Sequence, residues 1–268
     1  MSESPNPSKG ERREAARTER LQREQAAAAG DHRRKRLLQL GGLRAAAAVI
    51  VIVAVVVSSG GGKKSGGTAS AGFQGVAETQ SLIGPIPQKG ITLGKADAPV
   101  TIVEFADPQC PFCKDYTLNE MPALVQKYVR TGKAKMDLRF LTFIGPDSVT
   151  AADALQGAAA QGKLWNAADL LYRNQGTENS GYVTSSFLNQ VLKDAGADPA
   201  KAIAAGGTPA VTQDLGAAKT LASRYGVDST PTVLVGPTGG QLKKDTEPTP
   251  TAAGIGKLVD AAATQGGT

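Results

Sequence analysis

The chain has 268 residues, a net charge of +6 at pH 7 and two cysteines, so it can form one large or two small domains but cannot build a framework of several disulfides. Residues 1–44 hold 11 Lys and Arg and 6 Asp and Glu, a charge of +5, whereas the rest of the chain carries +1. Because the basic charge belongs to the N-terminal segment, it does not indicate a folded domain that binds nucleic acid.

Residues 1–36 predict a basic, disordered tail. They are rich in charged residues, Gln and Ala and poor in large apolar groups, so they have little surface to bury. A Lys- and Arg-rich run in front of an apolar stretch is a topology signal, which predicts that this tail stays in the cytoplasm.

Residues 37–59 predict a single transmembrane anchor. The uncharged core, Ala45–Val57, would form a helix of about 20 Å, shorter than the hydrocarbon layer of about 30 Å. Extending the stretch back to Leu37 gives about 35 Å, with Arg44 reaching towards the cytoplasmic side. A cleaved signal peptide is the alternative, since short apolar cores are typical of such peptides and Ala69-Ser70-Ala71 fits a cleavage site. Both interpretations place the rest of the chain outside the cytoplasm, and the first makes it a single-pass protein of the cell membrane.

Residues 60–89 begin with a Gly- and Ser-rich run, which predicts a flexible tether, and the folded domain is expected over residues 90–268. Its first half is predicted to hold three strands and one helix that is kinked at Pro122: Ile91–Leu93, Pro99–Ala106, Pro111–Arg130 and Lys135–Phe143. A helical block is expected over about 146–225, with helices at Thr150–Gln175 (broken near Gly162), Ser185–Ala195 and Val211–Tyr225. A strand at Thr232–Val235, a turn at Gly239-Gly240, a short strand at Gln241–Lys243 and a helix at Ala252–Thr264 complete the domain.

The two cysteines lie three residues apart in Cys110-Pro111-Phe112-Cys113, between the expected central strand and the kinked helix. Strand, Cys-x-x-Cys and helix in this order are typical of a redox motif. With Cys110 at the helix cap and Pro111 at the first helical position, the N–H groups of Phe112 and Cys113 point towards the Cys110 sulfur. They stabilise a thiolate there, so its pKa falls below the free value of about 8.5. Cys110 is therefore the expected nucleophile, and the shielded Cys113 the resolving thiol.

Two other uses of the cysteine pair remain open. A zinc site usually has four Cys or His ligands, and the only histidine, His32, lies in the distant basic segment. Zinc would need a dimer that shares two pairs, so no metal site is predicted within one chain. The other alternative is an inert local disulfide, which an extracytoplasmic location would permit.

The residues around the pair carry a family resemblance. The segment Val103-Glu104-Phe105-Ala106-Asp107-Pro108-Gln109-Cys110-Pro111-Phe112-Cys113 resembles the active-site segment of DsbA-like thiol-disulfide oxidoreductases, in particular the membrane-anchored BdbD-type branch of Gram-positive bacteria. A second landmark, Tyr225–Val235, is similar to the family's segment with a cis-proline beside the active site, and Thr230-Pro231 match that position. Phe112 stands where a histidine is common in the best-known DsbA pattern.

The resemblance implies an α/β, thioredoxin-like fold with an inserted helical domain, here preceded by the N-terminal transmembrane helix. It implies an extracytoplasmic enzyme that introduces disulfides into secreted or cell-envelope proteins, with Cys110 and Cys113 as the redox centre and no dissociable cofactor. The implied partners are reduced clients in extended form, bound beside Thr230 and Pro231, and a membrane reoxidant of the DsbB or vitamin-K-epoxide-reductase type.

Glu104 lies six residues before Cys110, where thioredoxin-like proteins often carry a buried acid. A lone Glu inside an apolar strand is costly unless it has a role. The resemblance implies that Glu104 accepts the proton of Cys113 during exchange, directly or through water. The alternative is a solvent-facing residue of an alternating strand, in which Ile102, Glu104 and Ala106 share one face.

Two further functions fit the same sequence. One is a reductase or isomerase on this scaffold, because the direction of electron flow depends on a reduction potential that sequence does not give. The other is a catalytically silent thioredoxin-like module that holds extended peptides.

Overall fold

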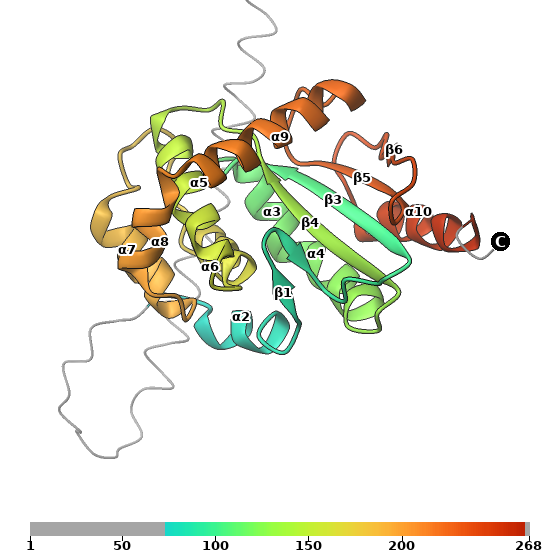
Figure 1. Cartoon of the computed structure of the whole chain (residues 1–268), viewed down its shortest axis with the longest axis horizontal. Helices are drawn as coiled ribbons and strands as arrows, with labels where there is room; N and C mark the ends of the chain where they lie inside the picture. The colour runs from blue at the N-terminus through green and yellow to red at the C-terminus, as the bar shows by residue number, and fades with distance from the viewer. Residues whose placement is uncertain (1–72, 266–268) are drawn as a thin grey trace, which may run out of the picture. The chain divides into compact units, whose positions relative to one another are not determined.

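The computed structural model describes residues 73–265 (Figure 1). The predicted tail at 1–36, the predicted anchor at 37–59 and the first part of the predicted tether lie outside the described residues. Within residues 73–265, no helix is both long enough and apolar enough to cross a membrane.

Six strands form one mixed sheet in the order β1-β2-β4-β3-β5-β6. The central strand β3 pairs in parallel with β4 and antiparallel with β5. All seven residues of β3 are buried, as expected for a strand covered on both faces. The strand bounds are β1 Gln88–Lys89, β2 Thr92–Leu93, β3 Val100–Ala106, β4 Ala134–Phe140, β5 Thr232–Pro237 and β6 Lys243–Lys244.

The two faces of β3 belong to two different clusters of buried side chains. Val103 and Phe105 pack with Ala218 and Ala222 of helix α9 (Pro209–Tyr225). Ile102 and the other residues of even number face the larger core, which contains helices α3 (Pro111–Asn119) and α10 (Ala252–Gln265). The period of two in an extended strand produces this division, and it directs Glu104 towards the larger core.

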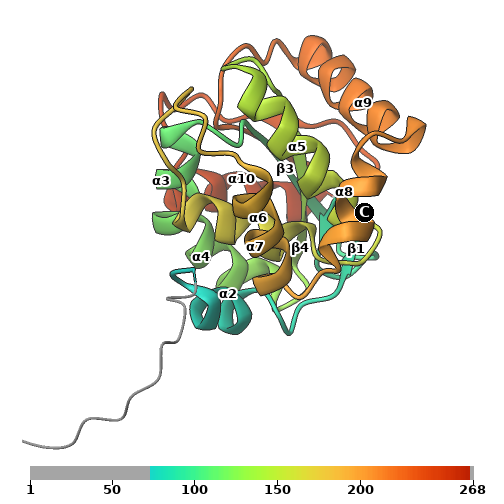
Figure 2. The same cartoon turned by 90° about the vertical axis from the view of Figure 1, so that its left-hand side faces the viewer.

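A block of five helices lies between β4 and β5 in the chain and beside the sheet in space (Figures 1 and 2). The block occupies the residues at which the insertion is predicted, about 146–225. Its helices are α5 Pro146–Ala159, α6 Leu164–Arg173, α7 Ser185–Asp194, α8 Pro199–Gly206 and α9 Pro209–Tyr225. Helix α8 was not predicted, and α5 begins four residues before the expected start because Pro146 occupies its first turn.

Helices α5 and α8 pack closely, and a glycine makes this contact possible. A Cβ atom at Gly157 would lie 1.9 Å from the carbonyl oxygen of Ala202. A side chain there would force the two helices apart, so Gly157 is required for the packing of the insertion.

The predicted helix at Pro111–Arg130 is interrupted rather than simply kinked. Helix α3 ends at Asn119, helix α4 (Met121–Leu124) follows, and a π-helical segment η1 (Val125–Val129) completes the run. The break falls at Glu120, two residues before Pro122. Proline lacks an N–H and its ring clashes with the carbonyl four residues earlier, so the regular helix ends on its N-terminal side.

The predicted boundary between tether and domain at residue 90 is too late. Helix α2 (Val76–Leu82) lies within the predicted tether 60–89, and its Thr79 is buried and donates a hydrogen bond to Asp169 of α6. Arg130 also donates a hydrogen bond to the carbonyl of Leu82 at 2.9 Å. These contacts with the insertion and the end of η1 make α2 part of the folded domain.

Candidate active site

Cys110 is the N-cap residue of α3, and Pro111 occupies the first turn of the helix. The cap lies just beyond the end of β3, where the Cys110 N–H donates to the carbonyl of Asp107 at 3.0 Å. Lys114 N–H donates to the carbonyl of Cys110 at 3.1 Å and begins the helical hydrogen bonds. The strand, cysteine pair and helix therefore have the predicted arrangement.

The environment of Cys110 favours a thiolate. A hydrogen bond from the Cys113 thiol, helped by the backbone N–H groups of Cys113 and Phe112, lowers the pKa of Cys110 to about 6 although burial opposes this change. Only 4% of the residue is exposed. The pKa falls by the mechanism predicted from the helix N-terminus, with the neighbouring thiol as the larger cause.

Cys113 has the opposite character. It is completely buried, and burial together with the hydrogen bond and charge of Cys110 raises its pKa well above that of a free thiol. One cysteine is thus an acidic thiol at the helix cap, and the other a buried thiol that does not ionise readily. This difference is what a nucleophile and a resolving thiol require.

The Thr230–Pro231 segment lies against the nucleophile, as the resemblance implies. The peptide bond between these residues is cis, and the Cys110 thiol donates to the Thr230 carbonyl at 3.4 Å. Two segments that are 120 residues apart in the chain thus meet at one sulfur. Pro231 also lines an open depression of about 340 Å³, together with Ser229, Thr232 and Lys244.

Glu104 is buried, so the alternative of a solvent-facing residue is wrong. It is 1% exposed and lies in β3 between Leu138 of β4 and Val233 of β5. Burial raises its pKa to about 8, because a carboxylate in an apolar interior loses its hydration. At neutral pH the folded protein therefore keeps this carboxyl mostly protonated.

Asp107 was not predicted as a functional residue, yet it organises the loop that carries Cys110. It is completely buried, and its carboxylate accepts four hydrogen bonds. Oδ1 accepts from Gln109 N–H at 2.9 Å and the Ser148 hydroxyl at 2.6 Å, and Oδ2 from the N–H groups of Phe143 and Ile144 at 3.1 and 3.2 Å. The last two bonds hold the loop after β4, and this strand ends at Phe140 rather than at the predicted Phe143.

The helical insertion supplies further contacts to this loop. Gln175 donates to the carbonyls of Pro108 and Cys110 at 2.9 and 3.2 Å, and Tyr172 donates to the carbonyl of Asp107 at 3.1 Å. The sequence signal was the polar Asp107-Pro108-Gln109 run before the first cysteine, but its partners lie 36 to 70 residues away. Sequence spacing alone could not pair them.

Phe112, between the cysteines, points outwards. Its side chain is 64% exposed, and Phe143, in the loop held by Asp107, is 56% exposed. Phe112 therefore presents an apolar ring to solvent at the position between the two cysteines.

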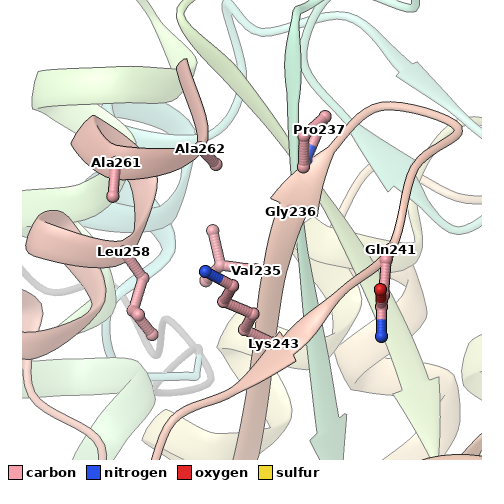
Figure 3. A pocket seen from close by; sticks show the side chains of 8 residues that line it. All are labelled: Val235, Gly236, Pro237, Gln241, Lys243, Leu258, Ala261 and Ala262. Carbon is pink, nitrogen blue, oxygen red and sulfur yellow. The ribbon is translucent and has the colours of Figure 1, made fainter. Parts of the chain in front are cut away.

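Another pocket, shown in Figure 3, does not belong to this site. It has a volume of about 40 Å³ and lies between β5, β6 and α10, at the end of β5 that is remote from Pro231. Its lining contains Lys243 and Gln241 but no thiol, carboxylate or imidazole, so it offers no group for thiol exchange or proton transfer.

The sequence profile of the thioredoxin family matches residues 87–251. The chain belongs to this family. In sequence, it is 34% identical over 105 residues to a probable disulfide bond formation protein D of Bacillus cereus, covering 38% of this chain and 49% of that protein. It is 31% identical over 103 residues to disulfide bond formation protein D of Bacillus subtilis, covering 38% and 46%. These matches span about half the length of the curated relatives.

Solved structures show the same fold. BdbD from Bacillus subtilis, in its oxidised form, matches with a TM-score of 0.57 and 21% identity over 67% of this chain and 98% of that one. DsbA from Chlamydia trachomatis matches with a TM-score of 0.56 and 19% identity over 78% and 100%. The predicted thioredoxin-like fold of the DsbA type is therefore confirmed for the folded domain.

Proposed function

We propose that this protein is a thiol-disulfide oxidoreductase that introduces disulfides into secreted or cell-envelope proteins. The observation that carries the proposal is the contrast between the two thiols. The pKa of Cys110 is lowered to about 6 at the helix cap, whereas that of the buried Cys113 is raised. An inert structural disulfide would not need this contrast, because it depends on neither thiolate character nor access.

In the oxidised enzyme, a client thiolate attacks the Cys110 sulfur and the Cys110–Cys113 bond breaks. Its electron pair passes to the Cys113 sulfur, which takes a proton from the carboxyl of Glu104. A second client thiolate then attacks the client sulfur of the mixed disulfide, and Cys110 leaves as a thiolate that its surroundings stabilise. The client is oxidised by two electrons, and the enzyme becomes a dithiol.

The backbone beside Pro231 suits an extended client. The Thr230 carbonyl lies at the Cys110 sulfur, and the depression next to Pro231 is open to solvent along Ser229 and Thr232. A client strand could pair with this backbone while its cysteine faces Cys110. Phe112 would add an apolar contact beside the reacting sulfur.

The remaining parts of the proposal rest on the sequence. The redox centre is the Cys110–Cys113 disulfide, without a dissociable cofactor, and a membrane protein of the DsbB or vitamin-K-epoxide-reductase type would reoxidise it. Residues 37–59 would anchor the chain, with residues 1–36 in the cytoplasm and the thioredoxin domain outside.

The test is catalysis of refolding of a reduced substrate that needs disulfides. The wild type should accelerate it, and Cys110→Ser should not, since the remaining thiol, Cys113, is completely buried. A wild type without catalysis would instead favour a silent peptide-binding module. Metal analysis of the reduced protein separately tests the zinc-sharing dimer.

A reductase or isomerase is the second candidate, and one relative is named for thiol:disulfide interchange rather than for disulfide formation. The chain is 35% identical over 72 residues to the thiol:disulfide interchange protein DsbG of Escherichia coli, over 27% of each chain. Equilibration of the cysteine pair with glutathione decides the direction, because an oxidant of the DsbA type lies near −120 mV and reducing thioredoxins near −270 mV.

Topology needs its own experiment. Reporter fusions after residue 70 should be active only outside the cytoplasm, and the protein should remain in the membrane fraction. Release of a shorter soluble form that begins near Gly72 would exclude the anchor and favour a signal peptide.

A further inference from the structure

A small internal cavity lies between the sheet, the active-site helix and the helical insertion. Glu104 of β3, Thr117 of α3 and Asp169 of α6 all line it, and Trp165 and Tyr172 contribute to its largely apolar remainder. Its volume is about 10 Å³, close to the space that the centre of one water molecule requires.

Three buried oxygen atoms from these residues lack a protein partner within residues 73–265. They are Glu104 Oε2, Thr117 Oγ1 and Asp169 Oδ1. The three residues are 1%, 3% and 1% exposed. Buried oxygens without partners are rare because each costs free energy. A cavity of about 10 Å³ with these three residues in its lining has the volume and the polar groups that one buried water needs.

Asp169 connects this cavity to the surface. Its second oxygen, Oδ2, accepts a hydrogen bond from Thr79 and lies 2.7 Å from Arg173 Nε. The side chain of Arg173 is 20% exposed, whereas that of Asp169 is 1% exposed. Asp169 thus lines the cavity, has one buried oxygen without a protein partner among the described residues, and has its other oxygen paired with a partly exposed side chain.

We propose that Asp169 is the second carboxylate of a proton relay, in which the proton of Cys113 passes to Glu104, through one cavity water held also by Thr117, and on to Asp169 beside Arg173. This inference rests on the proposed function. Asp169 touches neither sulfur, so it is a positioning residue that acts through Glu104.

The relay allows the buried carboxyl of Glu104 to lose its own proton before it accepts the proton of Cys113. When Cys113 resolves a mixed disulfide, its S–H bond breaks, its sulfur bonds to Cys110, and the partner leaves as a thiolate. Glu104 can accept the released proton only if its own proton has moved on, because burial keeps it mostly protonated at neutral pH. In the described part of the chain, Glu104 Oε2 has no protein hydrogen-bond partner through which to pass that proton on. A water shared with Asp169 can carry the proton away, towards the edge of the fold where Asp169 pairs with the partly exposed Arg173, and from there it is released to solvent.

The experiment follows reduced full-length protein mixed with glutathione disulfide at pH 7. Acid-quenched samples analysed by intact mass give two rates: formation of the Cys110–glutathione disulfide and its resolution by Cys113. Asp169→Asn should leave formation unchanged and slow resolution about tenfold or more, which is less than the roughly 10²–10⁴-fold of a direct general acid or base because Asp169 acts through Glu104. In a Glu104→Gln background, Asp169→Asn should have no further effect, because the relay is already interrupted.

Two variants separate the relay from packing. Thr79→Val removes a partner of Asp169 without touching the cavity, so resolution should keep its wild-type rate. Thr117→Val removes a buried hydroxyl that has no protein partner, so it should not destabilise the fold, yet it should slow resolution several-fold. It also keeps the proposal testable if Asp169→Asn does not fold.

Normal resolution in Thr117→Val, equal slowing in Thr79→Val and Asp169→Asn, or additive effects of the Glu104 and Asp169 substitutions would each overturn the relay. These glutathione rates require no client. If the wild type fails to catalyse refolding while both rates behave as expected, the proposed function falls and the relay remains.

Discussion

Glu104→Gln should stabilise the folded protein, and the gain should grow with pH. The side chain is 1% exposed, and burial raises the pKa of its carboxyl from 4.5 to about 8. An acid whose pKa is raised by folding does not lower the free energy of unfolding at pH values below its pKa in the unfolded chain. As pH rises above that value, the unfolded state ionises first, so the folded state loses stability until its own pKa is reached.

The magnitude follows from the two pKa values. Each pH unit between them costs about 1.4 kcal/mol. At pH 7 the penalty is therefore about 3 kcal/mol, and above pH 8 it levels off at about 5 kcal/mol. Glutamine has nearly the same shape and no charge, so Glu104→Gln should remove this penalty and match the wild type near pH 4.5.

Urea unfolding of the reduced proteins at pH 4.5, 7 and 8.5 measures the difference. The matched control is Glu178→Gln, because Glu178 is exposed and its substitution should change stability little at any of these pH values. A difference between wild type and Glu104→Gln that stays constant from pH 4.5 to 8.5 would show that the carboxyl ionises in the folded state as it does in water, and the reasoning would fail.

Three more predictions address the active site. Cys113→Ser should accumulate mixed disulfides with clients, seen on non-reducing gels, because resolution is lost; adducts from Cys110→Ser instead would reverse the two roles. Phe112→His should lower the pKa of Cys110 and raise the reduction potential, because a cation beside the thiolate stabilises the reduced form. Thiolate absorbance against pH and equilibration with glutathione measure the two quantities. A potential near −120 mV that is unchanged in Phe112→His would show that the helix N-terminus alone stabilises the thiolate. Asp107→Asn should destabilise the fold by about 3 kcal/mol or more, because an amide NH2 group would replace an oxygen that accepts two hydrogen bonds. Ser148→Ala removes only one of the donors and should cost about 1–2 kcal/mol. Equal losses in the two variants, measured by urea unfolding, would contradict the conclusion that the Asp107 carboxylate organises the loop.

Local chemistry explains where sequence prediction succeeded in the fold. The apolar run before Cys110 predicted β3 to within one residue at its start and the same residue, Ala106, at its end. The period of 3.6 and the following glycines predicted α7 and the end of α9, where Gly226 adopts a left-handed conformation. Helix α2 was missed because its stability comes from contacts with distant residues, among them Asp169, and no local pattern records such contacts.

The sequence by itself determined the reactive pair. Two cysteines three residues apart, with a proline directly after the first, place one thiol at the N-cap of a helix. This local arrangement does not depend on how the helix packs in the domain. The tertiary structure alone decided the rest of the site. Burial, which depends on what covers both faces of β3, made Glu104 a weak acid. The contacts of Thr230 with Cys110, and of Asp107 with the loop after β4, join segments that are far apart in the chain. Whether a polar side chain finds a partner depends on the packing of the whole domain, so the sequence could not place Asp169 beside the cavity of Glu104.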